Sequence, residues 1–231
     1  MIIGVFSGKG GVGKTTVALN IANSFSKQGS RALLIDADLY TPNVGLSLGS
    51  GLTDKSSFDV IKKDHSIFDV VYRHSCGINF VPAKISSDFS ERDFFIFSQK
   101  IVSLKSSFDV IILDMPSGLG PHVKHLLSCC DSSLIVTSPD LPSVANSLKA
   151  INVCKNVSCD ILGVVVNMVK NSSYELSSSE IESFLGAKIL SSLDYDDIVK
   201  ESVFLKSPVF SSFPRSSFSQ NISSIVFSLM S

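Results

Sequence analysis

The sequence predicts an α/β fold, with a mostly parallel β-sheet and helices on both of its faces. Two observations lead to this prediction. Short, almost wholly apolar runs alternate with longer segments in which apolar residues recur at helical spacing. Acidic or glycine-rich stretches directly follow several of the apolar runs, as is usual at the carboxyl ends of parallel strands. Strands that alternate with helices imply right-handed crossovers and a sheet buried on both sides.

The first elements flank a glycine-rich loop. Residues 2–6 are an apolar run typical of a buried strand, and residues 14–28 carry an apolar face at roughly helical spacing. Gly29 is suited to end that helix, and the next buried strand spans 32–36. The same patterns predict later strands at about 78–82, 109–114, 133–138, 161–167 and 188–192, and helices near 91–105, 121–128, 143–155, 178–185, 196–206 and 217–230. With no repeat or clear linker, we expect residues 1–231 to form one domain.

Composition limits the class of protein. The chain has 231 residues, which is enough to bury a large core. Hydrophobic residues make up 44% of it and charged residues 18%, a composition that argues against disorder. Its mean hydropathy is +0.32. A net charge of −1 and a pI near 6.4 give no overall attraction to nucleic acid or to an anionic membrane. No apolar run approaches the roughly 18 residues of a membrane span, and the start lacks the basic segment of a secretory signal.

Residues 7–16, which read SGKGGVGKTT, carry the most specific signal in the chain. Gly8, Gly13, Lys14 and Thr15 fit the phosphate-binding pattern G-x-x-x-x-G-K-[ST], between a predicted strand and a predicted helix. Glycines let the backbone approach phosphates closely, and the helix start adds amides and a favourable dipole. We expect Lys14 to bridge the β- and γ-phosphates and Thr15 to bind Mg²⁺. The residues expected to contact the nucleotide here are Gly8, Lys9, Gly10, Gly11, Val12, Gly13, Lys14, Thr15 and Thr16, the last at the α-phosphate.

Lys9 is a second lysine on the rim of this loop, from which it could reach a nucleotide held by another subunit. The run K-G-G-V-G-K-T-T resembles the deviant Walker A motif of the MinD/ParA family, P-loop NTPases of the SIMIBI class that include nitrogenase iron-protein relatives and Mrp-type cluster carriers. The resemblance covers nearly the whole chain and is closest to the MinD-like proteins. It implies that ATP and Mg²⁺ drive a sandwich homodimer in which Lys9 contacts the phosphates of the partner.

Two further carboxylates follow the second strand. Asp36 and Asp38 stand at the strand end where open α/β sheets bind ligands. The stretch D-A-D-L-Y-T-P-N-V-G-L-S-L-G resembles the first switch region (switch I) of the family. By that resemblance Asp38 orients the attacking water, and Asp36 lies near Mg²⁺ or near Lys14. Simple capping of a loop by either carboxylate is the alternative interpretation.

Asp114 ends a wholly apolar strand and precedes Met115 to Gly120. An acidic residue in this place is the Walker B arrangement, which holds Mg²⁺ directly or through water. The glycines that follow suit a second switch loop, in which the Gly118 N–H senses the γ-phosphate. Predicted metal-binding residues are therefore Thr15, Asp36 and Asp114, and predicted catalytic residues are Lys9, Lys14 and Asp38.

Asn167 ends the strand predicted at 161–167 and offers both a donor and an acceptor to a purine edge. The family resemblance supports that role. Family members usually place a proline-containing stretch over the other side of the base, whereas this chain has Leu193-Asp194-Tyr195-Asp196 there. The sequence therefore does not identify the residues that clamp the base beyond Asn167.

The five cysteines are Cys76, Cys129, Cys130, Cys154 and Cys159, with no C-x-x-C among them. Binding of a soft metal between subunits is one interpretation of the pairs 129–130 and 154–159. Small buried thiols beside a strand are the simpler one.

Three functions remain. The favoured one is a MinD-like ATPase that binds Mg-ATP, dimerises and hydrolyses ATP slowly, as a switch for spatial regulation such as placement of the cell division site. The alternatives are an iron–sulfur or metal-cluster carrier of the Mrp or nickel-insertion type, and a ParA-like DNA-partition ATPase. Besides these three functions, the chain could be a relative that no longer hydrolyses ATP.

DNA binding is not expected, because cations near the chain end are sparse. The last helix lacks the basic face of a membrane anchor, so we expect a cytoplasmic protein that reaches a membrane only through a partner. The sequence does not identify that protein partner.

Overall fold

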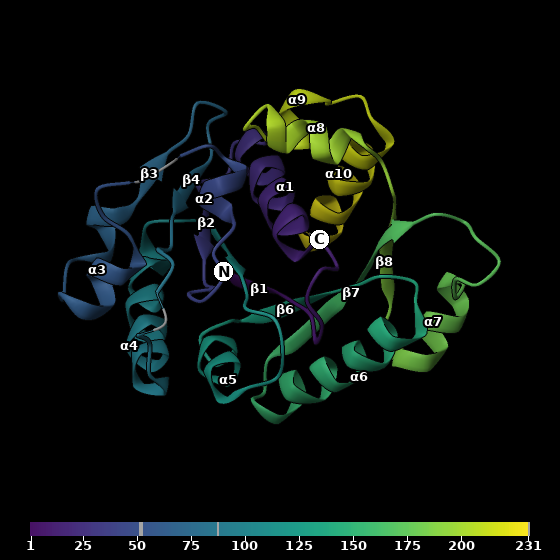
Figure 1. Cartoon of the computed structure of the whole chain (residues 1–231), viewed down its shortest axis with the longest axis horizontal. Coiled ribbons are helices and arrows are strands. Elements are labelled where there is room, and N and C mark those ends of the chain that lie inside the picture. The colour runs from purple at the N-terminus through teal and green to yellow at the C-terminus, as the bar shows by residue number, and fades with distance from the viewer. Residues whose placement is uncertain (51–52, 87, 231) are drawn as a thin grey trace.

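The computed structural model of the chain describes residues 1–50, 53–86 and 88–230. A twisted eight-stranded sheet runs through this part of the chain (Figure 1). Its strands are β1 (Ile2–Phe6), β2 (Ala32–Asp36), β3 (Tyr72–Arg73), β4 (Asn79–Val81), β5 (Val110–Asp114), β6 (Ser132–Thr137), β7 (Asp160–Val169) and β8 (Ile189–Asp194). The order is β3-β4-β2-β5-β1-β6-β7-β8, and every neighbouring pair is parallel except β3 with β4. The predicted fold class is confirmed.

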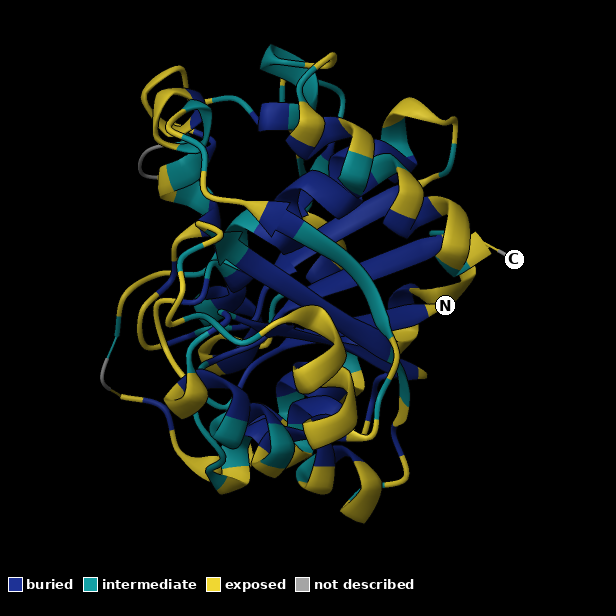
Figure 2. Cartoon of the chain, turned by 90° about the vertical axis from the view of Figure 1, so that its right-hand side faces the viewer, coloured by how far each residue is buried: buried dark blue, intermediate teal, exposed yellow. Residues whose placement is uncertain are grey.

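Helices cover both faces of the sheet, and Figure 2 shows the buried strands lying between them. One layer holds the first and last helices of the chain, and the other holds those from the middle. The helices are α1 (Lys14–Lys27), α2 (Val44–Ser47), α3 (Ser57–Lys62), α4 (Glu91–Val102), α5 (Pro121–Leu127), α6 (Leu141–Asn156), α7 (Ser178–Leu185), α8 (Ile198–Phe204), α9 (Val209–Ser212) and α10 (Ser217–Met230), with 3₁₀ turns at Ile67–Val70 and Ser103–Ser106.

Alternating side chains of each central strand enter opposite cores, as the strand period requires. In β1, Ile3 and Val5 pack in the core beneath α1 and α10. Ile2 and Phe6 join the opposite core, which α4, α5 and α6 cover. All five β1 residues are buried, so this strand is a rigid base for the loop that leaves its carboxyl end.

The last helix packs in the core, as its apolar spacing predicts. Phe218, Ile222, Ile225 and Val226 are buried, and α10 lies against α1 and β8. No helix among the described residues has the length and apolar character needed to cross a membrane.

The structure corrects several predicted boundaries. The helix predicted at 91–105 stops at Val102 and continues as the 3₁₀ turn, and the one predicted at 196–206 is the shorter α8. The segment between β2 and β4, left unassigned, contains α2, α3 and the antiparallel edge strand β3. These pieces are only two to six residues long, too short for periodicity to reveal them.

Candidate functional site

A cavity of about 350 Å³ opens at the carboxyl edge of the sheet, where the parallel strands β1, β2, β5 and β7 end together. The phosphate-binding loop forms one wall, and the loops that follow β2 and β5 form others. The lining residues are Gly10, Gly11, Gly13, Lys14, Thr15, Asp38, Thr41, Asn43, Met115, Ser117 and Met168. Three stretches far apart in sequence, all singled out for phosphate chemistry, therefore meet at one cavity.

Gly13 fixes the shape of the loop at the start of α1. Its φ is +86°, and a Cβ placed there would lie 2.2 Å from Nδ2 of Asn167. That Asn167 nitrogen donates to the Val12 carbonyl at 2.9 Å. The buried Asn167 side chain on β7 therefore supports the loop. The sequence predicted only a contact between Asn167 and a purine, and not this support.

Alanine at Gly13 is expected to distort the loop, whereas alanine at Gly11 tests the backbone strain alone. Gly11 also has a positive φ, of +81°, but a Cβ there would meet nothing within 4 Å. We expect Gly11→Ala to cost about 1 kcal/mol of unfolding free energy and Gly13→Ala roughly 2–3 kcal/mol, because only the latter adds a clash. Urea unfolding measures both. Equal losses in the two variants would show that the close approach of Asn167 to Gly13 adds no cost to the substitution.

Lys14 extends from the first turn of α1 towards the loop after β5. Its Nζ donates to Oγ of Ser117 at 2.7 Å, and only 7% of the residue is exposed. Burial lowers the pKa of Lys14, while the nearby Asp114 and Asp38 raise it. The ammonium is thus partly stripped of water and has two carboxylates near it, an environment suited to receiving the phosphates of a nucleotide.

Thr15 and Asp114, the residues predicted to bind Mg²⁺ from the phosphate-binding loop and from β5, lie side by side. The Thr15 hydroxyl donates to Oδ2 of Asp114 at 2.6 Å. Burial raises the pKa of Asp114 to about 7, against the lowering effects of the Thr15 hydrogen bond and of Lys14. Such a carboxylate gains from a cation that replaces its lost hydration.

Asp36 and Asp38 separate into different positions. Asp36 is fully buried, and its carboxylate accepts from the backbone N–H groups of Asp38, Asn43 and Val44 at 3.3, 3.0 and 3.0 Å. Burial, and next the charge of Asp114, raise the pKa of Asp36 well above its ordinary value. Asp36 therefore holds the switch I loop, and its predicted place near Mg²⁺ stays a prediction.

Asp38 lines the cavity. Its carboxylate accepts from the Thr41 backbone N–H at 3.0 Å and from the Thr41 hydroxyl at 2.9 Å. These bonds fix the carboxylate at the mouth of the cavity. The predicted role in orienting water is compatible with this position and stays a prediction.

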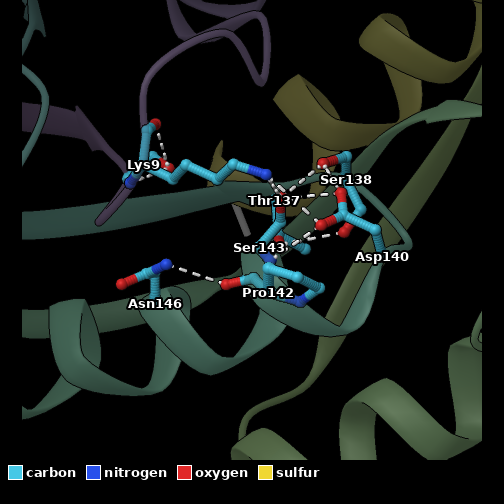
Figure 3. Close-up of polar contacts among 8 residues, drawn as sticks. Lys9, Thr137, Ser138, Asp140, Pro142, Ser143 and Asn146 are labelled. Atoms are coloured by element: carbon cyan, nitrogen blue, oxygen red, sulfur yellow. Dashed lines mark hydrogen bonds and ion pairs between the residues drawn. The ribbon is translucent and has the colours of Figure 1, made fainter.

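Lys9 extends towards the start of α6 (Figure 3) and is not among the residues that line the cavity. Its Nζ donates to Oγ of Ser143 at 3.0 Å and pairs with Oδ1 of Asp140 at 3.4 Å. Asp140 is the N-cap of α6 and also accepts from the Ser138 and Ser143 hydroxyls and the Ser143 backbone. Burial alone would raise the pKa of Asp140, but these hydrogen bonds and Lys9 lower it to about 2, so the pair is ionic at neutral pH.

The remaining predicted residues come from three separate parts of the fold: the loop after β5, the start of α1 and the stretch after β8. Gly118 has a φ of +94°, on the same loop as Ser117. Thr16 accepts at its carbonyl from the Asn20 side chain, in the first turns of α1. Tyr195, from the stretch where a proline was expected, has Lys170 and Lys200 over its ring at 4.8 and 5.1 Å from the centroid. These contacts do not identify the residues that clamp the base.

Sequence reasoning missed the residues that hold the two lysines. The G-x-x-x-x-G-K-[ST] pattern does not contain the residues around the two lysines, which are Ser117, Ser138, Asp140 and Ser143. A local signal existed only for Asp140, because Asp followed by Pro in the first turn marks a helix start. A contact between the first switch loop and α5 was missed as well, where Tyr40 packs edge-on against His122 at 5.7 Å between ring centroids.

The cysteines fit the simpler of their two interpretations. Four of the five are buried in the core that α4, α5 and α6 cover: Cys129, Cys130, Cys154 and Cys159. Cys76 is half-buried and lies outside this core. Across the described residues, no three His, Cys, Asp or Glu side chains are arranged to hold a metal ion together. Mg²⁺ at Thr15 and Asp114 would accordingly take its other ligands from phosphate oxygens and water, as this ion commonly does.

Comparison with known proteins agrees with this geometry. The family description "AAA domain" matches residues 1–162, and the description "NUBPL iron-transfer P-loop NTPase" matches residues 99–229. An uncharacterised ATP-binding protein of Methanocaldococcus jannaschii is 29% identical over 99% of this chain and 87% of its own length. The septum site-determining protein MinD of Thermotoga maritima is 28% identical over 86% of this chain and 77% of its own length.

Solved structures give the same result. The Pyrococcus furiosus cell division ATPase MinD superposes with a TM-score of 0.92 at 26% identity, covering 99% of this chain and 98% of that one. The phosphate-binding loop, the acidic strand ends and the doubly covered parallel sheet all agree with the two family descriptions. The chain is a member of the ParA/MinD family of P-loop NTPases.

Proposed function

We propose that this chain is a MinD-like ATPase switch. It binds Mg-ATP, pairs with a second copy so that two nucleotides lie between the subunits, and hydrolyses ATP slowly to separate them. ATP and Mg²⁺ are its ligands, and the dimer is the state that a partner protein recognises. Its relatives support this function, since they include a septum site-determining protein and a cell division ATPase.

The position of Lys9 carries the proposal. This lysine belongs to the phosphate-binding loop, yet its Nζ lies at Ser143 and Asp140, whereas Lys14 alone of the two lines the cavity. Its side chain is 43% exposed on the rim. A cation so close to the phosphate site, and directed away from it, is better placed to meet the phosphates of a second subunit than those of its own.

The residues of the chain divide the chemical work. The N–H groups of the loop and Lys14 bind the β- and γ-phosphates and stabilise the charge that develops there. Thr15 and Asp114 would hold Mg²⁺, which would supply positive charge to neutralise the phosphates. Asp38 orients the water that attacks the γ-phosphorus, so that the bond to the ADP oxygen breaks. Lys9 of the partner would supply the further positive charge.

The other candidate functions have less support here. A cluster carrier needs cysteines that can meet across a subunit interface, and four of the five lie in the core. A DNA-partition ATPase needs free cations near the chain end, and Lys200 there pairs with Asp197 at 2.9 Å. A cytoplasmic location, with the membrane reached through a partner, agrees with the proposed switch.

Turnover per chain is expected to rise with protein concentration, and Asp140→Asn is expected to move that rise to lower concentrations. The substitution removes the ion pair that holds Lys9 within its own subunit, an exposed interaction worth about 0.2–1 kcal/mol. Two such pairs are released for each dimer formed, so the half-maximal concentration should fall roughly 2- to 30-fold. Phosphate release, measured across a protein dilution series with saturating Mg-ATP, gives this number.

Asp109→Asn is the matched control, because Asp109 forms a similarly exposed ion pair with Arg31 at the opposite edge of the sheet. Its half-maximal concentration should equal that of the wild type. Turnover per chain that is constant at all concentrations would contradict the proposed function.

A further inference from the structure

We propose that Ser117 senses the γ-phosphate and sets the preference of this site for ATP over ADP. The inference rests on the proposed function and adds to it a residue that no phosphate-binding pattern contains. Ser117 follows β5 by three positions, on the second switch loop. Its hydroxyl is the group that Lys14 contacts.

The Ser117 side chain lies inside the phosphate cradle. It lines the same cavity as Lys14 and Thr15. A Cβ placed on Gly10 would lie 3.6 Å from the Ser117 Oγ, so the hydroxyl stands between the outer arm of the loop and the Lys14 ammonium, which is 2.7 Å from it. Of the two phosphates that Lys14 is expected to bridge, the one nearer Gly10 would therefore come close to this hydroxyl.

The two ends of the loop face different neighbours. Gly13, at the α1 end, lies against Asn167, the predicted base contact, while Gly10, at the outer end, lies against Ser117. A nucleotide with its base near Asn167 directs its chain of phosphates towards Gly10. The terminal phosphate is thus the one that Ser117 meets, and ADP lacks it.

The hydroxyl has a hydrogen to give. Its oxygen accepts from Lys14, and within residues 1–50, 53–86 and 88–230 no acceptor takes its own hydrogen. A hydroxyl can accept and donate at once, so Ser117 can keep its bond to Lys14 while donating to a phosphate oxygen. Hydrogen bonds to ionised groups are about twice as strong as neutral ones. ATP would in this way fix the second switch loop, and ADP would leave it as it is.

The test compares binding of two nucleotides to three chains. Calorimetric titration with Mg-ADP and with a non-hydrolysable Mg-ATP analogue is carried out on the wild type, Ser117→Ala and Ser117→Thr, at concentrations where light scattering shows monomers. We expect Ser117→Ala to weaken analogue binding about 10-fold and to leave ADP binding within about 2-fold of the wild type. Ser117→Thr keeps the hydroxyl and should bind both as the wild type does.

Hydrogen exchange adds a readout that does not depend on affinity. The analogue should protect the amides of residues 115–120 in the wild type and in Ser117→Thr but not in Ser117→Ala. Ser128→Ala, at the far end of α5, is the control and should behave as the wild type.

Equal changes in the affinity for both nucleotides would overturn the inference, because a serine that only anchors Lys14 affects them alike. Equal protection of the switch loop in Ser117→Ala would overturn it too. Should the wild type bind neither nucleotide, the proposed function itself would be wrong, and the inference would fall with it.

Discussion

Replacing Lys9 with alanine is expected to abolish turnover while leaving one chain able to bind Mg-ATP. The Lys9 side chain does not line the cavity of its own subunit and pairs with Asp140 instead, so its loss is expected to leave the nucleotide contacts of the isolated chain intact. A preorganised charge that stabilises a phosphoryl transition state contributes roughly 100-fold or more to the rate. We expect at least that loss in steady-state phosphate release, with an ATP dissociation constant for the monomer within about 3-fold of the wild type.

Lys105→Ala is the matched control, because Lys105 forms a similarly exposed ion pair with Asp131 away from the cavity. It should retain turnover. A Lys9→Ala chain that hydrolyses ATP at the wild-type rate would show that Lys9 acts in neither subunit.

Replacing Asp114 with asparagine is expected to raise the stability of the nucleotide-free protein at pH 8 and to remove Mg²⁺-dependent activity. Burial raises the pKa of this carboxyl to about 7, whereas in the unfolded chain its pKa is near 3.8. The folded state therefore binds the proton more tightly, and its stability falls as pH rises from about 4 through 7. At pH 8 the variant should gain on the order of 2 kcal/mol of unfolding free energy, and at pH 5 much less.

Chemical unfolding at the two pH values, without metal or nucleotide, measures the stability effect. Mg-ATP turnover of the variant should fall roughly 100-fold or more, because the metal loses its acidic ligand. Asp36→Asn is the companion variant. Burial raises the pKa of that carboxyl as well, so the substitution is also expected to favour the folded state at pH 8. Its gain should be smaller than that of Asp114→Asn, because the amide nitrogen would face one of the three backbone N–H donors that the carboxylate accepts. A lower stability of Asp114→Asn than of the wild type at pH 8 would contradict this account.

Much of the site could be predicted because its residues obey local rules. A glycine-rich loop between a strand and a helix, and carboxylates at strand ends, are patterns a few residues long, and a parallel sheet brings strand ends to one edge. The structure accordingly brings five of the predicted residues together at one cavity: Gly13, Lys14, Thr15, Asp38 and, through its hydrogen bond with Thr15, Asp114.

The contacts that hold the site together could not be predicted in the same way. Lys9 reaches Ser143 across 134 positions and Lys14 reaches Ser117 across 103. Ser143 belongs to no recognisable pattern, and Ser117 lies in the predicted second switch loop, where no role was predicted for it. Such pairs depend on how the loops pack at the sheet edge, and periodicity carries no information about that. The short edge strand β3 was missed because two residues give no alternation to detect.

Light scattering of the eluting protein with Mg²⁺ and a non-hydrolysable ATP analogue tests the central claim most directly. We predict that the wild type elutes as a monomer of 24.8 kDa with ADP and at twice that mass with the analogue, and that Lys9→Ala stays monomeric with both nucleotides. At protein concentrations above those of the calorimetric titrations, a wild type that remains monomeric with the analogue bound, or a Lys9→Ala chain that dimerises as the wild type does, would contradict the account.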